Sequence, residues 1–257
     1  MPGPPYDSLV ARLRRAGCVY AEDEAALLVE AASGTDLEAR VRRREDGEPL
    51  EQVLGWAAFG GLRVPVRPGV FVPRRRTELL AREARGLLGP GAVVVELCCG
   101  TGAVSLVLAA ARRDLELYAA DLDPAAVACA ADNLAGLAEV SGGDLYAALP
   151  GRLRGRVQVL VANAPYVPTS AIALMPSEAR DHEPPVALDG GADGLDVLRR
   201  VVAGAPDWLA TGGTLAFECG AAQVRAATAA ARAAGLVPTV RHEEDLEATV
   251  VLARSSG

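Results

Sequence analysis

From residue 93 onward, short apolar runs alternate with segments of helical periodicity. We assign this pattern, together with the predicted helix that precedes it, to one domain that covers residues 73–257. Nearly continuous apolar strands separated by helices are typical of a parallel sheet covered on both faces. We therefore expect an α/β fold that binds its ligand beyond the carboxyl ends of the strands. The predicted strands are residues 93–97, 115–120, 157–162, 214–218 and 250–253. The predicted helices are residues 77–88, 104–112, 124–134, 195–209 and 221–234.

The first 72 residues have a different pattern. In residues 1–54, Leu9 and Leu13 and then Leu28 fall at helical spacings between charged residues, which predicts a small helical domain. Residues 55–72 are punctuated by Gly and Pro, as in a β-hairpin linker. The short apolar runs of this linker are residues 62–64 and 70–72. Farther on, the Pro- and Gly-rich residues 168–194 predict a long loop.

The basic residues and histidines exclude several chemistries. All 26 basic residues are Arg, so neither a Schiff base to pyridoxal phosphate nor a phosphate-loop lysine is possible. The two histidines, His182 and His242, cannot form a three-histidine metal site and disfavour a hydrolase triad. No metal is therefore expected.

Charge and cysteine content indicate the kind of partner and the redox compartment of the protein. A net charge of -7 argues against a broad nucleic-acid surface, although a local basic patch is compatible with it. Five cysteines without a C-x-x-C pair predict reduced thiols in a cytoplasmic protein. No segment has the roughly 20 uninterrupted apolar residues of a membrane span.

A glycine turn, Gly100-Thr101-Gly102, joins the first predicted strand of this domain to a helix. Glycines let a backbone turn tightly and approach a nucleotide closely. Ser105 replaces the third glycine of G-x-G-x-x-G, which disfavours a pyrophosphate-binding dehydrogenase. A plain strand-to-helix turn is the alternative.

Acidic residues at strand ends complete a candidate cofactor site. Asp121 ends the next strand, where a carboxylate accepts hydrogen bonds from ribose hydroxyls, and Leu122 beside it belongs to the same site. Asp123 is expected to be a helix N-cap. Asp144 either accepts from an adenine amino group or is a turn residue. Glu96 either faces an ammonium group or pairs with backbone amides, and the neighbouring Cys98 lines the turn.

The segment Asn163-Ala164-Pro165-Tyr166 follows the buried strand predicted at 157–162. The Asn163 side-chain oxygen and the Ala164 carbonyl can accept both N–H groups of a planar NH2, and Tyr166 can pack against its plane. An amide nitrogen is a poor nucleophile, and positioning it can remove roughly 7–11 kcal/mol of barrier at the favourable limit. No strong base is needed, since the proton can leave after methyl transfer. An Asn-led turn stopped by Pro165 is the alternative.

Together, the two turns predict an enzyme that methylates an amide or amine nitrogen with S-adenosylmethionine. Asn163 is expected to contact both the acceptor and the cofactor.

In the two turns and in several further segments, the chain resembles the HemK/PrmC family. These are the protein-(glutamine-N(5)) methyltransferases that modify the Gly-Gly-Gln motif of peptide chain release factors. The resemblance implies a class I methyltransferase domain with a mostly parallel seven-stranded sheet and S-adenosylmethionine as cofactor. It also implies that the N-terminal helices and the hairpin help to dock a release factor. The segments that carry it are residues 49–55, 72–80, 96–102, 121, 143–145, 163–166 and 183–188.

Two departures mark this chain as a divergent relative. Ala164 stands where the family's Asn-Pro-Pro-Tyr has its first proline, which keeps the carbonyl in a less rigid turn. Arg75 and Arg76 stand where Pro-Arg-Pro-Glu-Thr-Glu has Pro and Glu, next to Arg74, which we expect to bind substrate. A protein other than a release factor is therefore also a candidate substrate.

Three alternatives remain at this stage. The same fold methylates nucleobase amino groups in rRNA or DNA, which the acidic charge disfavours and the three arginines favour. The others are a nicotinamide-dependent dehydrogenase and a cofactor-binding protein without catalytic activity.

Overall fold

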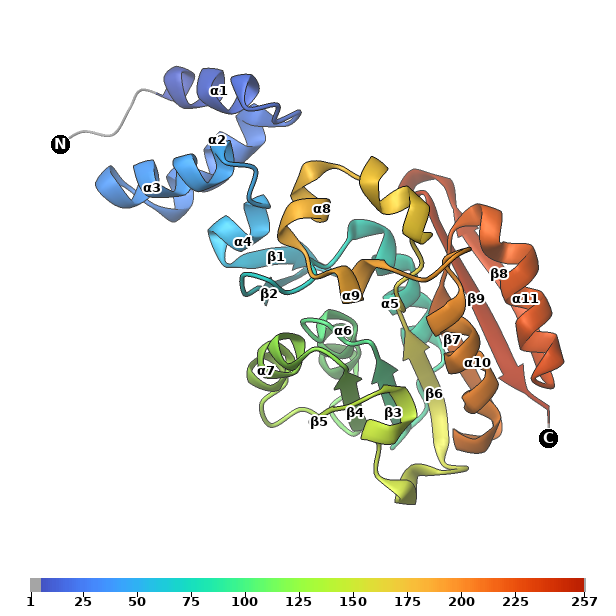
Figure 1. Cartoon of the computed structure of the whole chain (residues 1–257). Coiled ribbons are helices and arrows are strands. Elements are labelled where there is room, and N and C mark those ends of the chain that lie inside the picture. Colours follow the sequence, from blue (N-terminus) through green and yellow to red (C-terminus); the bar gives the residue numbers. More distant parts are fainter. Residues whose placement is uncertain (1–5, 257) are drawn as a thin grey trace.

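The computed structural model describes residues 6–256, and its centre is a seven-stranded sheet (Figure 1). The strand order is β5-β4-β3-β6-β7-β9-β8, in which the first five strands are parallel and β9 is antiparallel to both neighbours. This confirms the predicted mostly parallel sheet. The strands are β3 (Val93–Leu97), β4 (Glu116–Asp121), β5 (Glu139–Gly142), β6 (Val157–Ala162), β7 (Leu209–Glu218), β8 (Leu236–Glu243) and β9 (Ala248–Ser255).

Helices cover both faces of the sheet, as the continuous apolar strands predict. One face packs against α5 (Glu78–Gly86), α6 (Ala103–Ala111) and α7 (Pro124–Asn133). The other packs against α10 (Asp196–Trp208) and α11 (Val224–Ala233). The central strand β3 is buried at every position because apolar helices lie on both of its sides. Its end, and the ends of β4 and β6, therefore open toward one edge of a rigid core.

Two strands went unpredicted because their sequences carry little apolar signal. β5 is a short edge strand whose residues are exposed or half-buried. β8 forms the opposite edge and exposes most of its side chains to solvent. An edge strand pairs with one neighbouring strand and exposes more of its side chains, so its hydrophobic pattern is weaker than that of a central strand.

The N-terminal region forms a separate hydrophobic cluster that lies away from the sheet (Figure 1). Its helices are α1 (Tyr6–Arg15), α2 (Ala21–Ala31), α3 (Gly34–Glu45) and α4 (Leu50–Leu54). The hairpin that follows pairs β1 (Trp56–Phe59) with β2 (Leu62–Pro65). The expectation that residues 70–72 belong to the hairpin was wrong, since they form no strand. Val70 and Val72 are instead buried in small clusters of their own.

The long loop expected at residues 168–194 contains short helical turns instead. These are η4 (Thr169–Leu174), α8 (Ser177–His182) and α9 (Pro185–Leu188). Figure 1 shows this segment between the N-terminal helices and the sheet. Buried Arg44 of α3 forms ion pairs with Glu24 of α2 and Glu178 of α8, which tie this segment to the N-terminal helices. No helix within residues 6–256 combines the length and hydrophobicity that crossing a bilayer requires.

Candidate active site

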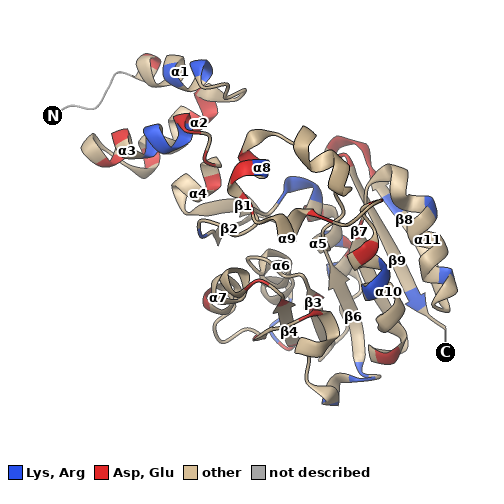
Figure 2. Cartoon of the chain, in the orientation of Figure 1, with Lys and Arg blue, Asp and Glu red and all other residues tan. Residues whose placement is uncertain are grey.

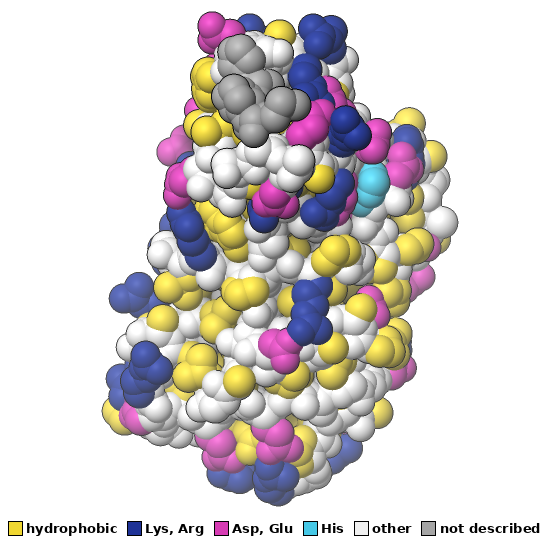
Figure 3. Space-filling view, turned by 90° about the vertical axis from the view of Figure 1, so that its left-hand side faces the viewer, with side chains coloured by type: hydrophobic (Ala, Val, Ile, Leu, Met, Phe, Trp, Pro, Cys, Tyr) yellow, Lys and Arg dark blue, Asp and Glu magenta, His cyan; other side chains and the backbone are white. Residues whose placement is uncertain are grey.

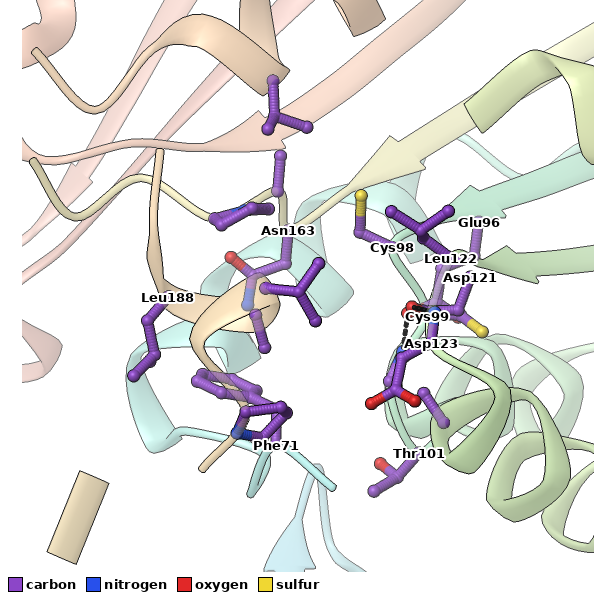
Figure 4. Close-up of a pocket in the computed structure, with 18 of the residues that line it drawn as sticks. Phe71, Glu96, Cys98, Cys99, Thr101, Asp121, Leu122, Asp123, Asn163 and Leu188 are labelled. Carbon is purple, nitrogen blue, oxygen red and sulfur yellow. Dashed lines mark hydrogen bonds between the residues drawn. The ribbon is translucent and has the colours of Figure 1, made fainter. Parts of the chain in front are cut away.

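An open cleft lies at the carboxyl ends of the parallel strands. Figure 4 shows two facing walls, with Asp121 and Thr101 on one and Asn163 and Phe71 on the other. We call these the cofactor wall and the acceptor wall. The predicted site residues that line the cleft are Arg74, Glu96, Cys98, Gly100, Thr101, Asp121, Leu122, Asp144, Asn163, Ala164, Pro165 and Tyr166.

Gly102 is the predicted site residue that does not line the cleft. Its φ is +74°, and a Cβ there would lie 2.8 Å from Leu134 Cδ1. Glycine is therefore needed at this position for the close packing of α6 against α7 rather than for contact with a ligand.

Asp121 organises the cofactor wall. Its Oδ2 accepts from the Gly100 amide at 2.8 Å, and its Oδ1 accepts from the Asp123 amide at 3.0 Å. Burial raises the pKa of this carboxyl. Each carboxylate oxygen can accept a further hydrogen bond, so Asp121 can hold the turn and still receive ribose hydroxyls. Asp123 accepts from the Ala125 amide at 2.9 Å, which confirms it as the N-cap of α7.

Glu96 lies deeper on the same wall and is almost fully buried. Its Oε2 accepts from the Ser105 amide at 2.8 Å and from the Ser105 hydroxyl, so pairing with a backbone amide is present. Burial raises the pKa of Glu96 to about 7. Among residues 6–256, no hydrogen bond reaches Oε1 of this cleft-lining side chain, which leaves it as the atom to meet a cation.

Cys98 and Asp144 complete the cofactor wall. Cys98 has a φ of +56°, in the left-handed region that favours glycine, and burial raises the pKa of its thiol. Asp144 Oδ2 accepts from Arg200 at 2.6 Å, and both side chains are about half exposed. One oxygen of Asp144 is therefore occupied by an ion pair, and the other accepts no hydrogen bond from the part of the chain that the structure describes.

Asn163 is the central polar group of the acceptor wall. Its Nδ2 donates to Thr77 Oγ1 at 3.3 Å, a weak but oriented contact across 86 residues of sequence. Because the nitrogen faces Thr77, Oδ1 is the end left to accept from a ligand. Sequence reasoning missed Thr77, which no local motif connects to this turn.

Tyr166 is fixed by a second residue that the sequence did not reveal. Its hydroxyl donates to Glu218 Oε1 at 2.7 Å. Glu218 ends β7 and is buried, and its Oε2 is the one buried side-chain oxygen or nitrogen without a partner among the described residues. Burial raises the pKa of both groups. The sequence did contain a signal for Glu218, since a carboxylate near the end of an apolar strand had already singled out Glu96.

Two residues that are distant in sequence hold the backbone of this turn. Gln223 Nε2 donates to the Tyr166 carbonyl at 2.9 Å. A Cβ on Gly194 would lie 2.2 Å from that carbonyl oxygen, so only glycine allows this approach. Ala164 is buried at the base of the turn.

Arg74 lines the cleft but is already bound by the protein. Its guanidinium pairs with buried Glu183 and lies 4.9 Å from the centre of the Phe71 ring. Glu183 also accepts from the Val72 amide at 3.0 Å. Arg74 therefore joins the segment before α5 to the segment before α9, and its contact with substrate remains a prediction.

The sheet order, the glycine turn after β3 and the acid at the end of β4 define a class I S-adenosylmethionine-dependent methyltransferase. Residues 62–176 match the model of the family described as the methyltransferase small domain.

Three relatives narrow the class. A release factor glutamine methyltransferase of Mycolicibacterium smegmatis is 44% identical over 66% of this chain, a match that spans 61% of that relative. The release factor glutamine methyltransferase of Deinococcus radiodurans is 35% identical over 96% of both chains. A 4-amino-L-phenylalanine/4-methylamino-L-phenylalanine methyltransferase of Streptomyces pristinaespiralis is 37% identical over 76% of this chain and 69% of its own length. The chain belongs to the release factor glutamine methyltransferase family, which confirms the family and the enzyme class expected from the sequence.

Proposed function

We propose that this protein transfers a methyl group from S-adenosylmethionine to the side-chain amide nitrogen of a glutamine, and that its substrate is a peptide chain release factor. The observation that carries the proposal is the position of Asn163 across one cleft from Asp121 and the Gly100 turn (Figure 4). The names of relatives that align over most of this chain support the choice of substrate.

The cofactor wall fits S-adenosylmethionine. Asp121 is placed to accept from the ribose hydroxyls beside the Gly100 turn, and Glu96 Oε1 to accept from the ammonium group. Leu122 is 55% exposed and offers an apolar surface for the adenine, with Asp144 near its amino group. When bound, the cofactor supplies an electrophilic methyl group on a positively charged sulfur.

The acceptor wall fits a planar amide. Asn163 Oδ1 and the Ala164 carbonyl accept from its two N–H groups, while the Tyr166 ring packs against its plane. Thr77 and Glu218 hold these groups in place before the substrate arrives. Such pre-positioning lowers the barrier because the nitrogen does not have to be oriented during the reaction.

The N-terminal helices, the hairpin and the adjoining residues 168–194 provide the docking surface for the larger part of the substrate. Apolar side chains are spread over the middle of the face shown in Figure 3. Leu174 and Val186 are exposed in the segment that lines and borders the cleft. An exposed apolar surface of this kind is typical of a protein-binding site.

The test is methyl transfer to a purified release factor, read by mass spectrometry at the glutamine of its Gly-Gly-Gln motif. We expect one added methyl group with the wild-type enzyme and none when that glutamine is replaced by glutamate. Transfer to bulk nucleic acid and not to protein would contradict the proposal.

A second candidate substrate is the ring amino group of a free aromatic amino acid. The similarity to the Streptomyces pristinaespiralis enzyme favours it. An arylamine is also a flat nitrogen, so the same acceptor wall fits it. Incubation with 4-amino-L-phenylalanine distinguishes the two candidates.

A further inference from the structure

The acceptor wall carries a positive charge beside the turn that holds the acceptor nitrogen. Arg76 lines the cleft together with Thr77, Asn163 and Tyr166. Its guanidinium carbon lies 5.8 Å from the centre of the Tyr166 ring, and its side chain is 47% exposed. In Figure 2, the blue turn ahead of α5 marks this stretch of arginines. A substrate that reaches Asn163 therefore passes close to a cation.

The three cleft-lining arginines differ in how far the protein neutralises them. Arg74 pairs with Glu183, and Arg200 donates to Asp144 at 2.6 Å. Arg76 instead places its Nε 3.6 Å from Glu218 Oε1, beyond hydrogen-bond distance. That oxygen already accepts from the Tyr166 hydroxyl.

The free end of Arg76 is the part that meets solvent or a ligand. Within residues 6–256, its two terminal nitrogens form no hydrogen bond with the protein, and the contact printed for its ion pair with Glu218 is made by Nε. Because Nε faces Glu218, these nitrogens form the outer edge of the guanidinium. Paired N–H donors on such an edge match the two oxygens of a carboxylate.

We propose that Arg76 is a specificity-determining residue that binds a carboxylate of the substrate next to the nitrogen that is methylated. This inference rests on the proposed function, because it concerns the same acceptor wall. The carboxylate has two possible sources with the same chemistry: an acidic residue beside the target glutamine of a protein, or the α-carboxylate of a free amino acid. Glu218 positions Arg76 by facing its Nε.

The experiment compares acceptors that differ only in this charge. One pair of peptides carries Asp or Asn beside the glutamine, and a second pair is 4-amino-L-phenylalanine and its carboxamide. For each pair, kcat/KM and the Kd in the presence of S-adenosylhomocysteine are measured. We expect the wild-type enzyme to prefer the acid by about tenfold in at least one pair, mostly through KM, as for a hydrogen bond to a charged group.

Arg76→Gln is expected to remove this preference, and Arg76→Lys to keep part of it because the charge remains without the fork. The matched control is Arg75→Gln, since Arg75 is an exposed neighbour that does not line the cleft. It makes the same change in charge and should leave the preference intact. Thermal melting checks that all three variants are folded.

Each outcome of these measurements either supports the inference or overturns it. A preference confined to the peptide pair identifies a protein carboxylate, and one confined to the amino acid pair identifies a small substrate. No preference in either pair, or an equal loss in Arg75→Gln, overturns the inference. If no acceptor is methylated, the proposed function fails, while the binding measurements still decide whether Arg76 selects a carboxylate.

Discussion

The two walls of the cleft are built in different ways. On the cofactor wall, Glu96 pairs with Ser105, nine residues away, and Asp121 with Gly100, 21 residues away. Asp144 at the edge of this wall is the exception, since it pairs with Arg200, 56 residues away. On the acceptor wall, Asn163 depends on Thr77, 86 residues away, and Tyr166 on Glu218, 52 residues away. The contacts of Glu96 and Asp121 form within β3, β4 and the start of α6, whereas those of the acceptor wall join the turn after β6 to the segment before α5 and to the end of β7.

This difference implies that a substitution on one wall can impair the function of that wall and leave the other wall intact. Changes on the acceptor wall should slow methyl transfer and spare cofactor binding. Changes on the cofactor wall should do the opposite.

The largest effect is expected for Asn163→Ala. Loss of the acceptor oxygen removes the group that orients the nitrogen, and turnover should fall by at least about 100-fold. Binding of S-adenosylhomocysteine, measured by calorimetry, should change by less than about threefold, because Asp121 and Glu96 are untouched. Equal turnover of the variant and the wild-type enzyme would remove Asn163 from the reaction.

Asp121→Ala tests the opposite wall. Two charge-assisted hydrogen bonds to the ribose are lost, so affinity for S-adenosylhomocysteine should fall by about ten- to a hundredfold. The acceptor KM at saturating cofactor should change little. Asp123→Ala is the matched control, since it removes a carboxylate two residues away that caps α7. Comparable losses in both variants would mean that the whole turn, and not Asp121 itself, holds the cofactor.

Glu96 gives the cofactor wall a pH dependence. Burial raises the pKa of Glu96 to about 7, so the group is largely protonated below that pH in the free enzyme. A cationic ammonium binds the ionised form, and affinity for S-adenosylhomocysteine should rise from about pH 6 to pH 7, by at most about tenfold, then level off. Glu96→Gln should abolish this slope, and an unchanged slope would exclude Glu96 as the cause.

The same group affects folding with the opposite sign. Because the folded state holds the proton more tightly than the unfolded state, the free energy of unfolding decreases as the pH rises from about 4.5 to about 7. Denaturant titration of Glu96→Gln beside the wild-type enzyme checks this direction.

The smallest effects are expected from the support of the acceptor wall. Tyr166→Phe and Glu218→Gln each weaken one hydrogen bond, so each should lower kcat by several-fold without changing cofactor affinity. The double variant should lose little more than either single variant, because the two groups act as one unit. Fully additive losses would show that they act independently.

The sequence predicts best the elements whose pattern is local, and it predicts least the edge strands and the contacts between distant residues. The bounds of β3 and β6 were predicted to the residue, because buried central strands have unbroken apolar runs. The sequence singled out Glu96, Asp121 and Asn163, which line one cleft in the structure, because each lies near or just after the end of such a run. The edge strands β5 and β8 were missed because their residues are mostly exposed. Thr77 and Glu218 were missed as site residues because their importance depends on contacts that exist only after folding.

The positions of the two ligands are tested by a crystal structure with S-adenosylhomocysteine and a glutamine-containing peptide bound. We predict the cofactor sulfur between the two walls, with Asp121 at the ribose and the glutamine amide hydrogen-bonded to Asn163 Oδ1. A glutamine bound elsewhere, or an Asn163 side chain turned away from the sulfur, would contradict it.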